Sequence, residues 1–322
     1  MKTVKVSYTG GEPWRGAAPF PQQSPGCRGI WGDYQFVFSN DMNAYDYWVV
    51  VDEIPKTETC TVSKRNTIFL AAEPPHIGSY PVAFLNQFGT VATCHPGIVS
   101  NPFVFANKVI SHPALAWFSN KTYDELVRMT EFPKPKLLSV ISSRKDERRY
   151  QFALAMKEEF GDAIDMFGRD TNSFLDKWDA HANYQYSIVL ENRSHPDYFS
   201  EKLTDCYLAM SYPFYYGGNI KKYFPAGSFT KIDIDDPAGA IDIIKDTTAR
   251  PMPESVRCAL EVARNRVLHR YSFFPTVVSI IEDHPRWFDA PGTDLSEVTI
   301  SDKWRFSKNA SMFVKKVLAG MR

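Results

Sequence analysis

The sequence predicts an α/β protein of two domains, and three observations support this fold class. The chain has 322 residues, and because a domain typically contains about 100–200 residues, two domains are expected. In residues 132–136 (FPKPK) prolines alternate with lysines, a pattern that keeps the backbone extended and is typical of a linker. After this linker, apolar β-rich runs alternate with amphipathic helical segments, which predicts parallel strands joined by right-handed helical crossovers.

The first domain is expected to span residues 1–132. Residues 2–8 alternate apolar and polar side chains like a strand, and residues 47–51 (YWVVV) and 67–71 (TIFLA) have the composition of buried strands. Weaker patterns predict short strands at 91–93 and 109–110, a loop over the Gly-, Pro- and Trp-rich residues 10–32, and a helix over 121–130.

The second domain is expected over residues 137–270 and resembles a Rossmann-like sheet, followed by C-terminal helices over 271–322 that pack back on the first domain. In the helix predicted over 197–210, apolar residues recur at the spacing of one helical face, from Phe199 to Met210. The remaining expected strands are 137–141, 163–167, 186–190, 213–216 and 230–234, and the remaining helices are 146–160, 173–180, 238–245, 253–271, 276–281 after a break at Pro275, and a basic helix near 311–318.

The composition disfavours several classes of protein. Lys+Arg and Asp+Glu both number 37, so the chain has no net charge, whereas a nucleic-acid binder carries a basic excess that neutralises phosphates. Hydrophobic residues make up 44% of the chain, enough to form a core. No run approaches the about 18 apolar residues of a membrane span, and the start lacks the apolar region of a secretory signal. We therefore expect a cytoplasmic protein.

The cysteines and histidines do not predict a metal site. The cysteines are dispersed, with no Cys-x-x-Cys pair, which argues against a disulfide framework and a structural zinc site. His76, His95 and His112 each follow an expected strand, without the short spacing that metal ligands show. The five cysteines are Cys27, Cys60, Cys94, Cys206 and Cys258.

The residues after strand 186–190 form the most informative constellation. Ligands of such sheets lie beyond the carboxyl ends of the strands, against helix N-termini whose free N–H groups favour anions. Lys202 adds a positive charge there, and Glu201 could accept hydrogen bonds from sugar hydroxyls. The alternative is an ordinary helix capped by Ser194 or Asp197, with Glu201 and Lys202 in solvent.

Residues 184–234 resemble the C-terminal signature of the α-1,3/4-fucosyltransferases, glycosyltransferase family 10. The shared parts, in order, are an aromatic strand, Glu191-Asn192, Tyr198, Glu201-Lys202, Pro213, Gly217 and Pro225 followed by Ser228-Phe229. The resemblance implies a GT-B fold, in which two Rossmann-like domains face each other across a cleft. It also implies inverting transfer of L-fucose from GDP-fucose to a glycan hydroxyl, in an α-1,3 type linkage, with no metal or other cofactor.

The resemblance further implies the donor-binding residues. By carry-over, Tyr198, Glu201 and Lys202 contact the donor, with Lys202 on the diphosphate and Asn192 supporting the pocket. The family also places an arginine at the start of the helix after the domain's first strand, which corresponds to Arg149. A guanidinium there could pair with a phosphate in a bidentate manner. Arg144 and Arg148 are alternatives to Arg149, and Arg169 follows a strand that resembles a second family element.

An inverting transferase also needs a general base near the acceptor hydroxyl. Family members carry a glutamate at the place where Glu73 follows strand 67–71, although here Glu-Pro replaces the family's Glu-Asn. Glu73 is therefore the expected base, and a surface carboxylate is the alternative. The expected acceptor-side residues are Trp14, Trp31 and His95.

Two other interpretations of the function remain open, and the basic C-terminal tail also has two interpretations. The same fold could use a different nucleotide-sugar donor, or the chain could be a catalytically silent nucleotide- or glycan-binding protein. The expected partners are a nucleotide-sugar donor and a glycan acceptor, such as lipopolysaccharide or capsule, and no nucleic acid. The basic C-terminal tail could contact the inner face of an anionic membrane or pack on the first domain.

Overall fold

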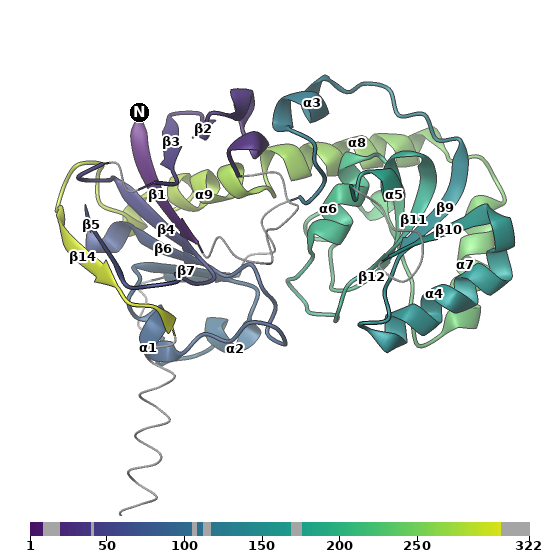
Figure 1. Cartoon of the computed structure of the whole chain (residues 1–322), viewed down its shortest axis with the longest axis horizontal. Helices are drawn as coiled ribbons and strands as arrows, with labels where there is room; N and C mark the ends of the chain where they lie inside the picture. The colour runs from purple at the N-terminus through teal and green to yellow at the C-terminus, as the bar shows by residue number, and fades with distance from the viewer. Residues whose placement is uncertain (9–19, 40–41, 105–107, 112–116, 169–175, 304–322) are drawn as a thin grey trace, which may run out of the picture. The chain divides into compact units, whose positions relative to one another are not determined.

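The computed structural model describes residues 1–8, 20–39, 42–104, 108–111, 117–168 and 176–303. The chain divides into two units (Figure 1). Unit 1 contains residues 1–14, 29–113 and 277–322, and unit 2 contains residues 15–28 and 114–276. No helix within the described ranges is long and apolar enough to cross a membrane.

Unit 1 is built on a largely parallel sheet with the strand order β2-β3-β1-β4-β6-β7-β8. Neighbouring strands are parallel except for β2, which is antiparallel to β3. The strands are β1 (Lys2–Tyr8), β2 (Ile30–Trp31), β3 (Tyr34–Val37), β4 (Tyr47–Val51), β6 (Thr67–Leu70), β7 (Thr90–Thr93) and β8 (Lys108–Ser111).

The central strands of this sheet are buried along their whole length. Every residue of β4 (YWVVV) and of β6 (TIFL) is buried, which explains why both appear in the sequence as continuous apolar runs. Phe69 of β6 packs edge to face on Phe84, with ring centroids 5.5 Å apart. Phe84 belongs to α1 (Val82–Leu85), and α2 (Pro96–Val99) follows β7.

A second, antiparallel pair joins distant parts of unit 1. Strand β5 (Glu58–Val62) pairs with β14 (Ser296–Ile300), and neither strand was expected from the sequence. Phe288 also packs on Tyr47, with ring centroids 5.8 Å apart. These contacts are the physical reason that the chain from Val277 onward belongs to unit 1.

Unit 2 is a parallel sheet with the order β10-β9-β11-β12-β13. The strands are β9 (Lys136–Ile141), β10 (Ile164–Phe167), β11 (Tyr184–Leu190), β12 (Tyr212–Tyr216) and β13 (Thr230–Lys231). The helices are α3 (Tyr123–Arg128), α4 (Glu147–Phe160), α5 (Asp179–Ala182), α6 (Glu201–Leu208), α7 (Pro237–Thr248) and α8 (Glu254–His269), and α9 (Phe273–Glu282) runs from unit 2 into unit 1.

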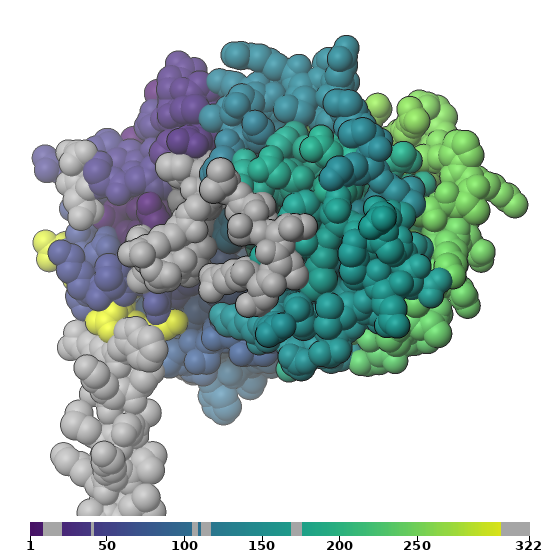
Figure 2. Space-filling view, turned by 45° about the vertical axis from the view of Figure 1, so that its right-hand side comes forward, coloured from purple at the N-terminus to yellow at the C-terminus, as the bar shows by residue number. Residues whose placement is uncertain are grey.

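The core of unit 2 is rich in aromatic rings. Phe199, Tyr207 and Phe224 are fully buried, and the ring centroids of Tyr207 and Phe224 lie 4.7 Å apart. Helix α6 packs on α8, and α7 packs on α4. Figure 2 shows the green segments of α7 and α8 at the surface of this unit.

The structure corrects several expected boundaries. The helix expected from Asp197 begins at Glu201, because Ser200 is the N-cap residue and its side chain accepts a hydrogen bond from the Lys202 N–H. Neither Ser194 nor Asp197 therefore caps this helix. Pro275 does not break a helix but lies in the first turn of α9, where a missing N–H costs nothing because first-turn N–H groups have no intrahelical partner.

The limits of the units also differ from those of the expected domains. Residues 114–132 group with unit 2, because Trp117 and Leu126 pack in its core. Helix α5 begins at Asp179, later than the expected 173–180, of which residues 173–175 lie outside the described residues. The basic helix expected near 311–318 also lies outside them.

Candidate functional site

The strand order of unit 2 locates its candidate ligand site. Strand β9 comes first in this unit, β10 pairs on one side of it and β11 on the other. The direction of the connections therefore reverses between β9 and β11, and in doubly wound sheets ligands bind at the carboxyl ends of the strands at this point. Asp146 and Arg149 follow β9, whereas Glu191 and Asn192 follow β11. Arg149 and Asn192, both selected from the sequence, thus lie at this edge of the sheet.

Glu191 is the structural centre of the site. Its side chain is fully buried, with Oε1 accepting the Ser200 N–H at 2.7 Å and Oε2 accepting the Ser200 hydroxyl at 2.7 Å. Lys202 Nζ lies 3.9 Å from Oε2. Burial raises the pKa of Glu191, and the Lys202 charge and the Ser200 bonds oppose that shift. Glu191 therefore ties the end of β11 to Ser200, the N-cap residue of α6.

Glu201 and Lys202 form a charged cluster with Lys177. Glu201 Oε1 accepts hydrogen bonds from Lys177 Nζ at 2.8 Å and from Lys202 Nζ at 3.2 Å. Burial opposes ionisation of Glu201, but the two lysine charges outweigh it and hold its pKa well below the usual range. Burial likewise disfavours the charge of Lys202, yet Glu201 and Glu191 raise its pKa overall. Glu201 and Lys202 are thus held charged and paired, which excludes the alternative in which both are simply solvated.

Arg149 lies at the start of α4, beside the end of β11. Its Nη1 donates to the Leu190 carbonyl at 3.0 Å, and its Nε lies 3.0 Å from Asp146 Oδ2. The Arg149 charge opposes the rise in the pKa of Lys202, so the two cations lie close enough to interact. Arg148 instead pairs with Asp235 and donates to the Tyr216 hydroxyl.

The other residues selected in unit 2 are placed as follows. Asn192 is half-buried and Tyr198 is buried in the turn between β11 and α6. Arg144 is exposed, with its guanidinium 5.5 Å from the centre of the Tyr150 ring. Arg169 lies outside the described residues.

The turn between β11 and α6 rests on the loop after β12. Ser194 Oγ donates to the Gly217 carbonyl at 2.9 Å. A Cβ atom on Gly218 would lie 1.9 Å from the His195 carbonyl oxygen, so the backbones approach too closely for any side chain at residue 218. This close approach fixes the turn that carries Asn192 and Tyr198.

In unit 1, Glu73 follows β6 and is half-buried. His95 follows β7, and its Nε2 lies 2.8 Å from the Glu73 carbonyl oxygen. The structure therefore brings together two residues that the sequence analysis assigned to the acceptor side. Trp31 forms part of β2, and Trp14 lies outside the described residues.

Sequence reasoning missed Lys177 and the role of Glu191. A carboxylate that directly follows the apolar run YSIVL was a usable signal for Glu191, because carboxylates are rarely buried unless they are paired. No sequence signal connects Lys177 with Glu201, which is 24 residues away.

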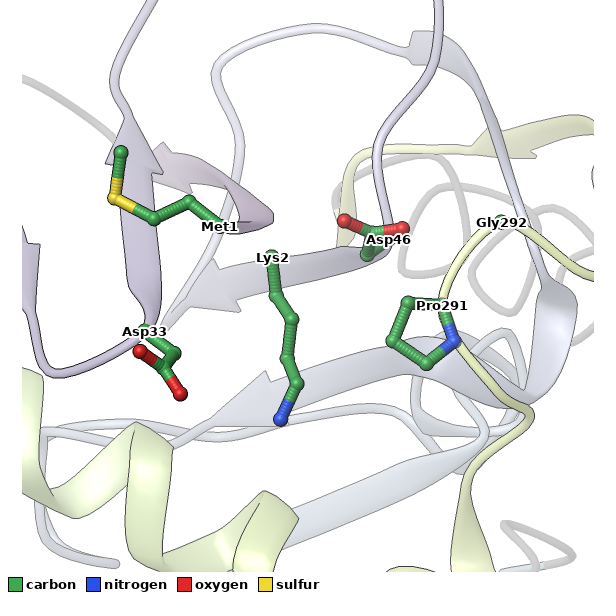
Figure 3. A pocket seen from close by; sticks show the side chains of 6 residues that line it. All are labelled: Met1, Lys2, Asp33, Asp46, Pro291 and Gly292. Carbon is green, nitrogen blue, oxygen red and sulfur yellow. The ribbon is translucent and has the colours of Figure 1, made fainter.

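A pocket of about 550 Å³ lies elsewhere in unit 1. Figure 3 shows the Lys2 side chain between Asp33 and Pro291. Lys2 begins β1, Asp33 precedes β3 and Asp46 precedes β4, so the pocket lies at the amino ends of these parallel strands. Ligands of such sheets bind at the opposite edge, where Glu73 lies, and the pocket is not part of the candidate site.

Unit 1 and unit 2 each have the parallel α/β architecture of one half of a GT-B glycosyltransferase, so the fold class is confirmed. The solved structures that resemble the chain include the following two. An alpha1,3-fucosyltransferase has 13% identity and a TM-score of 0.50, with 90% of each chain covered. An alpha1,3-fucosyltransferase with GDP-fucose has 14% identity and a TM-score of 0.51, with 88% of this chain and 89% of that chain covered. At such identities the likeness concerns the fold alone.

Part of unit 2 matches a known family of glycosyltransferases. Residues 133–244 match the family model described as glycosyltransferase family 10 (fucosyltransferase) C-term. This match supports the family resemblance that the sequence analysis found in unit 2, and with it the expected glycosyltransferase. A search of the curated proteins found no match.

Proposed function

We propose that this chain transfers L-fucose from GDP-fucose to a hydroxyl of a glycan acceptor, with inversion at the anomeric carbon and in an α-1,3 type linkage. The observation that carries the proposal is the charged cluster of Lys177, Glu201 and Lys202 at the first turn of α6. It lies within the segment that matches the family model, at the edge of the sheet where nucleotides bind in doubly wound folds.

Each group in the cluster suits one part of a nucleotide sugar. Lys202 supplies a full positive charge, and the dipole of α6 adds a partial positive charge at its N-terminus, so together they would hold the diphosphate. Glu201 is held ionised and can therefore only accept hydrogen bonds, which suits the hydroxyls of a sugar or ribose. Asn192 and Tyr198, in the adjoining turn, would complete the donor pocket.

The proposed reaction is a displacement at the anomeric carbon. Glu73 takes the proton of the acceptor hydroxyl as general base, and the hydroxyl oxygen forms a bond to the anomeric carbon. The bond from that carbon to the diphosphate oxygen breaks, and GDP leaves with the electron pair. Lys202 and Arg149 stabilise the charge that develops on the diphosphate, which is the work that a metal ion performs in other transferases. We therefore expect activity to persist in the presence of EDTA.

Thermal unfolding with GDP, UDP, ADP and CMP, each with and without its sugar, tests the donor. A ligand at about 100 times its Kd adds about 2.7 kcal/mol of stability, or an increase in Tm of about 5–10 °C for a unit of this size. We expect GDP and GDP-fucose to raise the Tm. If another nucleotide does so instead, the fucose assignment is wrong although the donor site stands.

Substitution of Lys202 tests the site. Lys202→Met should lower kcat about 100-fold, the loss typical when one donor to a developing negative charge is removed. Lys245→Met is the matched control, because Lys245 lies on α7 and its side chain is 52% exposed and pairs with Glu159. If Lys202→Met retains the wild-type rate, the site assignment fails. If the wild type binds GDP-fucose but neither hydrolyses nor transfers the sugar, the chain is a silent binder.

A further inference from the structure

Three neighbouring strands of unit 1 end beside one another in a cluster that the proposed function does not explain. Strands β4, β6 and β7 are adjacent and parallel. Asp52 directly follows β4, Glu73 follows β6, and His95 follows β7. Because the carboxyl ends of parallel strands meet at one edge of the sheet, residues from distant parts of the sequence come into contact here.

Asp52 holds the backbone on the N-terminal side of Glu73. Its Oδ1 accepts the Ala72 N–H at 2.8 Å and the Glu73 N–H at 3.2 Å, and it also accepts the Tyr80 hydroxyl. The backbone of Asp52 has a φ of 56°, a left-handed conformation that asparagine and aspartate tolerate better than other residues with a side chain. This conformation ends β4 and turns the Asp52 carboxylate toward the segment after β6.

Tyr80 in turn fixes the Asp52 carboxylate. Tyr80 is 8% exposed, and its ring packs edge to face on Phe69 of β6, with centroids 4.9 Å apart. Burial raises the pKa of Asp52, whereas the bond from Tyr80 and the two backbone N–H groups oppose that rise. The hydroxyl donor thus has a defined position and a defined partner.

His95 holds the other side of the same peptide segment. His95 is 6% exposed, and its Nε2 lies 2.8 Å from the Glu73 carbonyl oxygen. Because a carbonyl oxygen can only accept, Nε2 must carry the proton. The His95 ring also lies 5.2 Å from the Tyr80 ring, between centroids. The N–H and the carbonyl of Glu73 are therefore both bonded to side chains of neighbouring strand ends.

We propose that Asp52, Tyr80 and His95 are positioning residues that fix the backbone of Glu73, so that its carboxylate meets the acceptor hydroxyl in one orientation. The proposal rests on the proposed function, in which Glu73 is the general base. It assigns His95 a role other than the acceptor contact expected from the sequence. Small displacements of a reacting group are costly, since about 1 Å can change a rate about 100-fold, and side chains that lock a catalytic group are therefore part of a working site.

A comparison of single and double variants tests this positioning role. Tyr80→Phe removes the hydroxyl that fixes Asp52 and keeps the packed ring, and Asp52→Asn keeps a residue that tolerates the left-handed backbone. Both should lower kcat about 10- to 100-fold and leave the KM for the donor unchanged. In a Glu73→Gln background neither should lower the residual rate further, because both act through Glu73. The residual rate is measured by prolonged incubation with radiolabelled donor.

Tyr45→Phe is the matched control for loss of a buried tyrosine hydroxyl in unit 1. Tyr45 is 2% exposed, and its hydroxyl donates to the Ser39 carbonyl at 3.2 Å. Tyr45 precedes the amino end of β4, whereas the cluster of Asp52, Tyr80 and His95 lies at the carboxyl ends of the strands. This variant should retain the wild-type kcat. The positioning role is wrong if Tyr80→Phe and Asp52→Asn lower the rate by the same factor in the wild type and in the Glu73→Gln background. It is also wrong if neither variant lowers the rate of the wild type.

The same experiment separates this proposal from the proposed function. If Glu73→Gln retains the wild-type kcat, Glu73 is not the base, and both the base assignment and the positioning role are overturned. Binding of GDP by unit 2, measured separately by the rise in Tm, still reports on the donor site in that case. If Glu73→Gln is slow and the positioning variants are not, the proposed base stands and this inference alone fails.

Discussion

In the wild type, the free energy of unfolding of unit 2 should fall as the pH rises because of Asp205, and Asp205→Asn should remove this dependence. Asp205 lies in α6 and is 1% exposed. Its Oδ1 accepts the backbone N–H groups of Phe118 at 2.9 Å and Ser119 at 3.2 Å. Burial raises its pKa to about 7 from an ordinary value of 3.8, although the Lys177 charge and these two bonds oppose the rise.

Asp205 keeps its proton up to a higher pH in the folded chain than in the unfolded chain. Between pH 4 and pH 7, roughly, the folded chain keeps a proton on Asp205 that the unfolded chain has released. The free energy of unfolding therefore falls as the pH rises through this window. A difference of about three in pKa corresponds to an upper limit of about 4 kcal/mol. Asparagine does not titrate, so Asp205→Asn removes this slope.

Urea unfolding at pH 4.5, 6, 7 and 8, followed by tryptophan fluorescence, measures the effect. The relevant quantity is the free energy of unfolding of wild type minus that of Asp205→Asn, because the other titrating groups cancel in this difference. We expect the difference to fall by several kcal/mol from the lowest pH to the highest. A difference that is flat with pH, or that rises, refutes the assignment of a raised pKa to Asp205.

Three further predictions concern unit 2. Burial lowers the pKa of His181 to about 3, below its ordinary value of 6.5, so wild type should lose stability as the pH falls from about 6.5 to 3. His181→Asn should therefore lose less in the same urea titration, a slope opposite to that of Asp205. Lys177→Met removes a charge that keeps Glu201 ionised, so the acid limb of the pH–rate profile should move to higher pH; an unshifted limb would show that Lys177 does not act on Glu201. Gly218→Ala places a Cβ 1.9 Å from a carbonyl oxygen and should lower the free energy of unfolding by about 2 kcal/mol or more, measured by urea unfolding. At Gly227 the nearest atom to an added Cβ is 3.6 Å away, so Gly227→Ala is the control and should change stability little; equal effects of the two would contradict the close approach.

The sheet of unit 2 could be predicted from the sequence because its strands are local patterns. All five strands from β9 to β13 overlap expected segments, since alternation of apolar strands and amphipathic helices requires no knowledge of distant contacts. Strands β5 and β14 could not be predicted in this way. They pair across more than 230 residues, and the sequence of β5, ETCTV, has no apolar run that marks it as a strand by itself.

The candidate site was predictable in part. Glu201 and Lys202 were selected from a local motif, and they lie beside each other at the start of α6. The start of that helix was misplaced, because the hydrogen bonds from Ser200 to Glu191 decide where it begins, and these join two elements. The roles of Glu73 and Lys202 stay predictions that the experiments above test, and those of Arg149 and the other selected residues stay predictions as well.

The sequence by itself determined the fold class, the family signature and the segments that carry Glu73 and Lys202, because hydrophobic periodicity and short motifs are properties of consecutive residues. Only the tertiary structure determined which charged and polar groups come into contact. Lys177 reaches Glu201 across 24 residues, and Asp52 reaches the Glu73 N–H across 21 residues. These partners depend on which strands are adjacent in the sheet and on which side chains are buried at the ends of those strands. A buried carboxylate is stable only where the fold supplies hydrogen-bond donors to it.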